Sequence, residues 1–383
     1  MATDFNRLRL KHHGDAQKLH EILQMECRHK CGKKLASTLG LCPGFEFPSV
    51  ALAEMSTSDD VASLHADIID EPCSILDMTA GLGIDSFHFA RKGCRVTAVE
   101  ISHDAAEALS HNVRAMGLDD MVTVIEGDSV KWLEENDAEF DTIFIDPARR
   151  DSSGRHFSFS QCAPDLTLIM PLLLSRCSRL IVKASPMLDI SSALKELGVK
   201  SCDVITIGTT KECKEIVLDI CADTVHDDAT GVRISCHTVG GYAPYFISKG
   251  NDGCQPGYMK PEPGGFLMQP FPAVMKGTGG IVNGYSKLHP FTHLYYSDTF
   301  SDSFPGTSFP IIEVVPFNKA SVKSFRNDYP KINVASRNFP LSAPELAKKL
   351  RIAEGGEEMV FGVTLDDGSR ALIVTGPGVN HVR

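Results

Sequence analysis

Four acidic residues, each ending or directly following a short apolar run, mark the first half of the sequence. They are Asp77, Glu100, Asp128 and Asp146, and the first precedes the turn Ala80-Gly81-Leu82-Gly83. An acid inside a buried run is costly unless it has a partner, and a cationic ligand group is one such partner. Two glycines allow the backbone to approach a ligand closely. We therefore predict a ligand site assembled from several strand ends.

The residues around the glycine turn distinguish between two nucleotide cofactors. A dinucleotide turn needs a third glycine beside the pyrophosphate, and Ser86 holds that position here. Asp77 and Asp85 would also repel a pyrophosphate, whereas they would attract the ammonium and sulfonium of S-adenosylmethionine. Glu100 suits a ribose diol, and Asp128 could accept a hydrogen bond from the adenine amino group. These features favour S-adenosylmethionine over a nicotinamide cofactor.

Alternating strand and helix signals between residues 73 and 222 predict the elements that position these acids. This alternation predicts a doubly wound, Rossmann-like α/β sheet that is mostly parallel, with an antiparallel last strand. The expected strands are 73–79, 95–100, 122–126, 140–146 and 179–184, followed by a closing hairpin of 203–207 and 216–221. The expected helices between them are 84–92, 103–116, 129–135, 162–176 and 187–197. All four acids then lie at the carboxyl edge of the sheet.

The rest of the chain differs in style. Residues 1–70 are predicted to be helical, and residues 231–248 to form a β-pair. Residues 249–283 are rich in Gly and Pro and predict a loop or linker. Beyond them we expect strands at 285–296 and 310–316, helices from 320 and at 343–350, and a hairpin of 360–364 with 371–375. The domain division predicted is 1–70 (N-terminal helices), 71–225 (nucleotide-type sheet), 226–315 (small β-rich region) and 316–383 (small α+β domain).

Composition indicates an ordinary soluble protein. The 383 residues are 43% hydrophobic and 23% charged, with no signal segment at the start and no apolar run long enough for a membrane span. The 12 cysteines are scattered, which favours reduced thiols and a cytoplasmic location. Cys27 and Cys31 lie one helical turn apart, but no further soft ligands are near, so a buried thiol face is favoured over a metal site.

Charge is distributed unevenly along the chain. The net charge is −11. Residues 1–35 carry eight Lys or Arg and four Asp or Glu, and residues 316–351 carry eight and two. The two basic segments therefore flank an acidic middle. They could bind phosphates locally, although solvated surface lysines would give the same composition.

At this point the motifs resemble a known family. Asp77-Met78-Thr79-Ala80-Gly81-Leu82-Gly83 looks like the first motif of class I methyltransferases, with Thr79 where many members have glycine. Val99-Glu100, Gly127-Asp128-Ser129 and Asp146-Pro147-Ala148-Arg149 fit the later motifs in order and spacing. Along nearly its whole length the chain resembles a bacterial class I methyltransferase family with a ferredoxin-like insert, here around 288–295, and a C-terminal THUMP-like domain, here 322–374.

The resemblance implies a methyl donor, a substrate class and site residues. S-adenosyl-L-methionine is the expected cofactor, and no metal is expected. RNA is the expected substrate, because THUMP domains accompany RNA-modifying enzymes. The expected cofactor-binding residues are Asp77, Thr79, Ala80, Gly81, Gly83, Asp85, Glu100, Ile101, Asp128 and Ser129. The expected catalytic residues are Asp146, Pro147 and Arg149.

The acceptor loop leaves the chemistry of the methylated atom open. Amino-group methyltransferases have a second proline and an aromatic residue where this chain has Ala148 and Arg149. Pyrimidine C5 methyltransferases need a cysteine just after the fifth strand, where this chain has Lys183-Ala184-Ser185. We therefore expect direct in-line transfer, with Asp146 orienting the nucleophile or taking its proton.

Several other residues near the site are predicted contacts with an equally good structural explanation. Lys183 and Ser185 could contact the substrate, or could be a surface lysine and a helix cap. Ser56 to Ser58 could cover the methionine end of the cofactor, or simply cap a helix. Arg155 and His156 could be loop residues only. The competing functions are a methyltransferase for a small molecule, protein or DNA, and a non-catalytic RNA-binding protein with this fold; the oligomeric state cannot be read from the sequence.

Overall fold

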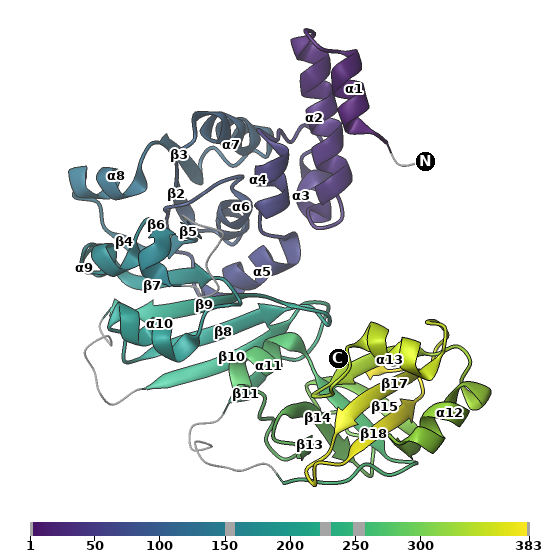
Figure 1. Ribbon diagram of the computed structural model, residues 1–383. Coiled ribbons are helices and arrows are strands. Elements are labelled where there is room, and N and C mark those ends of the chain that lie inside the picture. The colour runs from purple at the N-terminus through teal and green to yellow at the C-terminus, as the bar shows by residue number, and fades with distance from the viewer. Residues whose placement is uncertain (1–2, 150–157, 223–230, 248–256, 381–383) are drawn as a thin grey trace. The chain divides into compact units, whose positions relative to one another are not determined.

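The computed structural model describes residues 3–149, 158–222, 231–247 and 257–380. The chain divides into two compact units (Figure 1). The first comprises residues 1–203 and 216–232, and the second comprises residues 204–215 and 233–383. Within the described residues, no helix is both long and apolar enough to cross a membrane.

The predicted doubly wound sheet is confirmed. Strand β1 pairs in parallel with β2 on one side and β4 on the other, β2 pairs in parallel with β3, and β4 with β7. Strand β9 pairs antiparallel with β7, so the first antiparallel strand lies where the closing hairpin was expected. The complete order is β11-β10-β8-β9-β7-β4-β1-β2-β3. The strands are β1 Ser74–Asp77, β2 Arg95–Glu100, β3 Val122–Glu126, β4 Phe140–Ile145, β7 Cys177–Ala184, β8 Cys202–Gly208, β9 Cys213–Cys221, β10 Val232–Thr238 and β11 Tyr245–Ile247.

Reversal of the strand order beside β1 explains where the site forms. The chain places β2 and β3 on one side of β1, and then β4 and β7 on the other. Ligands bind outside the carboxyl ends of the strands at such a switch point. The first three strands lead into helices α6 Ile84–Arg91, α7 His103–Ala115 and α8 Ser129–Glu135, and α10 Ile190–Leu197 follows β7. Ile75, Leu76, Ile143 and Phe144 are almost fully buried, as expected for a parallel sheet covered on both faces.

The loop after β4 differs from the prediction. A helix was expected from residue 162, but α9 spans Leu166–Arg176 because Asp165 caps its N-terminus, accepting a hydrogen bond from the Thr167 N–H. The residues before it form a short pair of strands, β5 Ala148–Arg149 with β6 Cys162–Ala163, and a 3₁₀ turn at Phe159–Gln161. The apolar period alone gave no sign of where the helix begins.

The N-terminal region is helical, as predicted. Asp15 caps the second helix through the Lys18 N–H at 3.0 Å. Asp59 anchors the fifth helix, since its carboxylate accepts hydrogen bonds from the N–H and hydroxyl of Thr38 at 2.9 and 2.5 Å. The helices are α1 Phe5–Lys11, α2 Ala16–Cys31, α3 Ala36–Leu41, α4 Val50–Met55 and α5 Asp59–Ile68.

The second unit contains an eight-stranded sheet, and here one prediction is wrong. Residues 249–283 were expected to be a loop or linker, yet residues 266–278 form β12, which lies between β14 and β15, and helix α11. Pro272 is the first residue of α11, a position where proline favours rather than breaks a helix. The elements are β12 Phe266–Pro270, α11 Pro272–Thr278, β13 Ser286–His289, β14 Thr292–Ser297, β15 Gly306–Pro316, α12 Lys319–Asp328, β16 Asn333–Arg337, α13 Ala343–Leu350, β17 Met359–Thr364, β18 Arg370–Thr375 and β19 Val379–Asn380.

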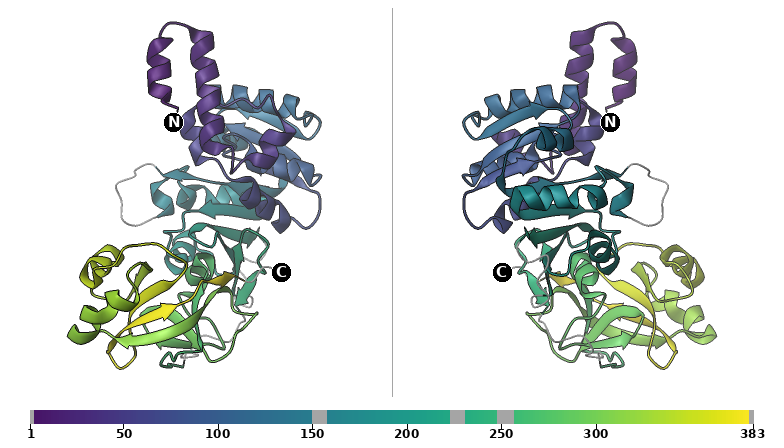
Figure 2. Two further views of the ribbon diagram at one scale, coloured as in Figure 1. Left: turned by 90° about the vertical axis from the view of Figure 1, so that its right-hand side faces the viewer. Right: turned by 90° about the vertical axis from the view of Figure 1, so that its left-hand side faces the viewer.

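Two helices cover one face of the C-terminal strands. Figure 2 shows α12 and α13, in yellow-green, on one side of the yellow strands β17 and β18. Phe325, Leu346 and Leu350 from these helices pack with Val360 and Leu372 from the strands. Strand β15 continues through residue 316, where the sequence had suggested a domain boundary. The division into four domains stays a prediction.

Candidate active site

A cavity of about 650 Å³ lies at the carboxyl ends of β1, β2, β3 and β4. The structure brings most of the predicted site residues together around it. Those that line the cavity are Thr79, Ala80, Gly81, Asp85, Glu100, Ile101, Asp128, Ser129 and Asp146. Asp77, Gly83 and Pro147 are not among the lining residues, and the side chain of Arg149 lies outside what the structure describes.

The glycine turn holds the carboxylate at the end of β2. Gly81, at φ +56, donates its N–H to Glu100 Oε2 at 2.8 Å. Ser102 donates its N–H to Oε1 of the same carboxylate, also at 2.8 Å. Each oxygen keeps a second lone pair, so the fixed carboxylate can still accept hydrogen bonds from a vicinal diol.

Asp128 has a structural role in addition to its predicted role of binding the adenine amino group. It caps α8, because Oδ1 accepts hydrogen bonds from the N–H groups of Val130 and Lys131 at 3.0 and 3.3 Å. This fixes the orientation of the carboxyl at the cavity wall. Ile101, which lines the same cavity, is 72% exposed despite its apolar side chain. An acid that faces a hollow beside an uncovered aliphatic group suits a flat heterocycle with an amino edge.

Asp77 is buried more deeply than the sequence suggested. It is 1% exposed, and its carboxyl accepts hydrogen bonds from the Ser86 hydroxyl at 2.6 Å and the Thr79 N–H at 3.2 Å. Burial raises the pKa of Asp77 to about 7. The prediction of a direct contact between Asp77 and a ligand therefore has no support from the cavity lining. Its charge can act on a ligand only through the residues that cover it.

Gly83 has a packing role that explains why a glycine is required. It has φ +77 and caps the N-terminus of α6. A Cβ at this position would lie 2.2 Å from Leu109 Cδ1 and 2.9 Å from Phe87 Cζ. The glycine lets α6 begin against α7, and its predicted contact with a cofactor remains untested.

Asp85 joins two partners that the sequence did not connect. Its Oδ1 lies 2.7 Å from His65 Nδ1, and its Oδ2 accepts a hydrogen bond from the Thr57 hydroxyl at 2.7 Å. Burial alone would raise the pKa of Asp85, but His65 and Lys183 outweigh it and hold the pKa below its usual range. Asp85 is therefore ionised at the cavity wall at neutral pH.

Asp146 is fixed from two sides. Its N–H donates to the Thr79 hydroxyl at 2.8 Å, and its Oδ2 accepts a hydrogen bond from Lys183 Nζ at 2.7 Å. Pro147 is buried beside it. Only the backbone of Arg149 is described, in a strand pair with Cys162. Arg150, Arg155 and His156 lie outside the described residues.

The apolar wall of the cavity was missed by the sequence analysis. Met55 and Leu168 line it and are 75% and 77% exposed, although both are large apolar side chains. His65 was also missed, because a single histidine on a helix carries no signal in the sequence. The exposed apolar residues could have been found only from the structure, since helical period favours burying them.

Cys27 and Cys31 form part of the core of the N-terminal helices. They are 0% and 1% exposed, and burial raises the pKa of Cys27 to about 12. Cys31 Sγ donates to the Ala53 carbonyl at 3.1 Å. Within the described residues no group of three or more potential metal ligands is found. The geometry agrees with a buried thiol face.

Replacing Thr79 by valine tests whether its hydroxyl positions the acceptor loop. Thr79→Val keeps the shape but leaves the Asp146 N–H without its acceptor, which costs about 1–3 kcal/mol. Thr79→Ser keeps the bond. We expect the valine variant to unfold at a lower temperature than the serine variant in calorimetry. Equal melting temperatures for the two variants would contradict this role.

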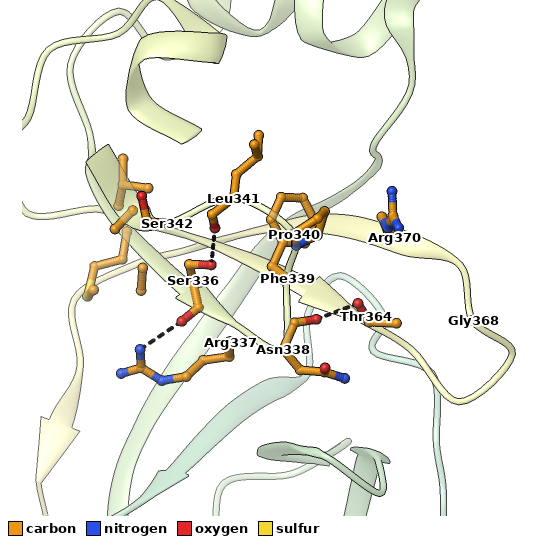
Figure 3. A pocket seen from close by; sticks show the side chains of 14 residues that line it. Ser336, Arg337, Asn338, Phe339, Pro340, Leu341, Ser342, Thr364, Gly368 and Arg370 are labelled. Atoms are coloured by element: carbon orange, nitrogen blue, oxygen red, sulfur yellow. Dashed lines mark hydrogen bonds between the residues drawn. The ribbon is translucent and has the colours of Figure 1, made fainter. Parts of the chain in front are cut away.

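A second hollow lies in the C-terminal domain (Figure 3). It has a volume of about 1050 Å³ and lies beside the loop between β16 and α13. In Figure 3 the Ser336 hydroxyl donates to the Leu341 carbonyl at 2.6 Å, and the Thr364 hydroxyl donates to the Asn338 carbonyl. Arg337 and Arg370 both line the hollow. Its charge is therefore positive, in contrast to the acidic cavity of the first unit.

Two protein families match separate parts of the chain. A family described as THUMP domain-like matches residues 306–377, and one described as Conserved hypothetical protein 95 matches residues 60–155. The crystal structure of a provisionally named methyltransferase from Porphyromonas gingivalis W83 is 26% identical, with a TM-score of 0.83. The likeness covers 98% of this chain and 94% of that protein.

Curated relatives match only short parts of the chain. An uncharacterized RNA methyltransferase of Mycoplasma mobile is 36% identical over 77 residues, which are 20% of this chain and 21% of that protein. A ribosomal RNA large subunit methyltransferase K/L of Pseudomonas aeruginosa is 30% identical over 90 residues, or 23% and 12% of the two chains. The chain thus spans about a fifth or less of these relatives' length. The resemblance predicted from the motifs is confirmed: the chain has the class I fold of the S-adenosylmethionine-dependent methyltransferases and carries a THUMP-like domain at its C-terminal end.

Proposed function

We propose that this protein is an S-adenosylmethionine-dependent methyltransferase that modifies RNA by direct in-line transfer. The observation that carries the proposal is the cavity of about 650 Å³ at the sheet's switch point, where the carboxylates of Glu100, Asp128 and Asp146 at three strand ends meet that of Asp85 from the first turn of α6. The methyl donor S-adenosylmethionine is cationic at one end and carries a ribose and an adenine at the other. These groups match the carboxylates of the cavity.

The residues present fit the donor. Glu100, held by the Gly81 and Ser102 N–H groups, would accept the ribose hydroxyls. Asp128 and Ile101 would hold the adenine, the first by its carboxyl and the second by apolar contact. The ionised Asp85 at the cavity wall and the deeper Asp77 favour the cationic end electrostatically. When bound, this cofactor supplies an electrophilic methyl group.

The acceptor side is centred on Asp146. A carboxylate held at fixed orientation can accept a hydrogen bond from the nucleophile and align it with the methyl group, which supplies much of the acceleration. The same carboxylate can take the proton released on transfer, which is typically worth 10²–10⁴-fold in rate, roughly. No cysteine lines the cavity among the described residues, and Cys162 nearby is buried. This supports direct transfer over a covalent cysteine intermediate.

RNA is the proposed substrate. The THUMP-like domain carries a basic hollow with Arg337 and Arg370, and two relatives that match parts of the chain are named as RNA methyltransferases. Basic side chains around a hollow give phosphate contacts that weaken steeply as salt rises. We also propose a cytoplasmic location, because an RNA-modifying enzyme with reduced thiols acts where RNA is found.

A comparison of modified nucleosides tests this function. RNA from cells with and without the gene is digested and analysed by mass spectrometry. We expect one methylated nucleoside to disappear without the gene and to return with the wild type, but not with Asp146→Asn. Calorimetry must show that this isosteric variant still binds S-adenosylmethionine. Identical nucleoside profiles would contradict the RNA substrate, and absence of donor binding in the wild type would contradict the enzyme class.

A further inference from the structure

Lys183 lies at the end of β7 in an unusual environment for a lysine. It is 9% exposed, and its ammonium group donates to Asp146 Oδ2 at 2.7 Å and to the Thr57 hydroxyl at 3.0 Å. A lysine that only covers apolar surface extends its charge to solvent. Lys183 instead directs its ammonium toward two residues of the cavity lining. Burying an ammonium in this way is costly unless the partners compensate for the lost hydration.

Thr57 extends the interaction to a second carboxylate. Its hydroxyl accepts from Lys183 and donates its one proton to Asp85 Oδ2 at 2.7 Å. Asp85 is in turn held by His65, which is 0% exposed. The two hydrogen bonds run in one consistent direction: Lys183 donates to Thr57, and Thr57 donates to Asp85. The ammonium group is therefore held in one position by groups on three separate segments of the first unit.

These contacts fix the orientation of the Asp146 carboxylate. Lys183 fixes Oδ2, while Thr79 fixes the main-chain N–H of the same residue at 2.8 Å. Within the described part of the chain, no hydrogen bond is found to Oδ1. A carboxylate that is held through one oxygen and its own backbone presents the other oxygen in a defined direction. Positioning of this kind affects turnover more than the affinity for the donor.

We propose that Lys183 is a positioning residue, which orients the Asp146 carboxylate toward the acceptor, and that Thr57 and Asp85 hold the Lys183 ammonium in place. This rests on the proposed methyl transfer and deepens it. Thr57 also lines the cavity, so the same hydroxyl connects the donor-binding wall with the acceptor loop. Lys183 does not contact the reacting atoms in this scheme. It acts through Asp146.

The matched variants are Lys183→Met and Lys92→Met. Lys92 is also a lysine with a carbonyl and a carboxylate partner, Ala66 and Asp67, but it is away from the cavity lining. Methyl transfer to RNA from cells lacking the gene gives kcat and KM, and calorimetry gives the Kd for S-adenosylmethionine. We expect Lys183→Met to lower kcat by about 10²-fold with a donor Kd within about threefold of wild type. Lys92→Met should change neither.

Two further measurements separate positioning from loss of folding. Thr57→Val should lower kcat by about tenfold and Thr57→Ser should restore it. The double variant Lys183→Met with Asp146→Asn should be no slower than Asp146→Asn alone, because the two residues act as a unit. A crystal structure of Lys183→Met should show the Asp146 carboxylate rotated from its wild-type orientation.

The outcomes distinguish the two proposals. Wild-type kcat in Lys183→Met, an unmoved Asp146, or additive losses in the double variant would overturn the positioning role while leaving the enzyme proposal intact. A donor Kd weakened as much as kcat would overturn it as well, because Lys183 would then belong to the donor site. If the wild type binds no S-adenosylmethionine, the proposed function fails instead.

Discussion

Asp77→Asn is expected to stabilise the protein at pH 8 and to leave it nearly unchanged at pH 5. Burial raises the pKa of Asp77 from 3.8 in the unfolded chain to about 7 in the folded one. Between these values the folded state binds more protons, so stability falls as pH rises through this window. The slope is at most about 1.4 kcal/mol per pH unit for one group. An amide of the same shape carries no such charge; its oxygen still accepts from the Thr79 N–H, and its NH2 group donates to the Ser86 hydroxyl, which turns to accept.

Differential scanning calorimetry of wild type and variant at pH 5 and pH 8 measures this. The difference between the two melting temperatures isolates Asp77 from the other titrating groups. Asp85→Asn is the contrasting control. Its carboxylate has a lowered pKa because of its partners His65 and Lys183, so its stabilisation is present at both pH values. We expect Asp85→Asn to be destabilised at both. A variant Asp77→Asn that melts below wild type at pH 8 would show that the buried charge is compensated.

The same substitution should weaken donor binding. A cationic ligand near Asp77 favours its ionised form, so wild-type affinity for S-adenosylmethionine should rise with pH up to about 7. In Asp77→Asn this rise should be absent, and affinity at pH 8 should be about tenfold or more lower. Isothermal calorimetry at pH 6 and 8 gives both numbers. If affinity rises with pH equally in both proteins, another group is responsible. A gain in stability with a loss of binding is typical of a site that holds a strained charge for function.

The strand ends were predictable from the sequence because each acid follows an apolar run with a clear end. Strands 95–100 and 122–126 and helix 129–135 agree with the structure at both ends. The reason is local: a parallel strand buried on both faces gives a continuous apolar run, and a glycine or a capping acid ends it. The class of fold followed from this pattern.

The hydrogen bonds that join Lys183, Thr57, Asp85 and His65 were not predictable, because these residues are far apart in the chain. Thr57 and Lys183 are 126 residues apart, and Asp85 and His65 are 20 apart. Nothing in the spacing of such residues indicates that they meet. The sequence shows that Asp77 ends a strand but not which way its side chain faces; the structure buries this side chain to 1% exposure, and its expected contact with the ligand stays a prediction. Helix α11 was missed since its proline was taken to break a helix that it begins.

Gly83→Ala should destabilise the first unit far more than Gly117→Ala, although both glycines have positive φ. At Gly83, φ is +77 and the new Cβ would lie 2.2 Å from Leu109 Cδ1, a side chain that is fully buried. At Gly117, φ is +65 and no heavy atom lies within 4 Å. In both variants the left-handed backbone lowers the free energy of unfolding by about 1 kcal/mol. In Gly83→Ala the overpacked core lowers it by about a further 1–3 kcal/mol.

Trp132, the only tryptophan, provides the measurement. It lies on α8 in the same unit as both glycines, so its fluorescence during denaturant unfolding follows that unit. We expect the midpoint of Gly83→Ala to fall clearly below that of Gly117→Ala, with little change in slope. The steric cost arises where α6 begins against α7, next to the Gly81 turn that holds Glu100. Equal midpoints would mean that Leu109 and Phe87 can move aside without loss, and that the second glycine of the turn is kept for the ligand rather than for the packing of the two helices.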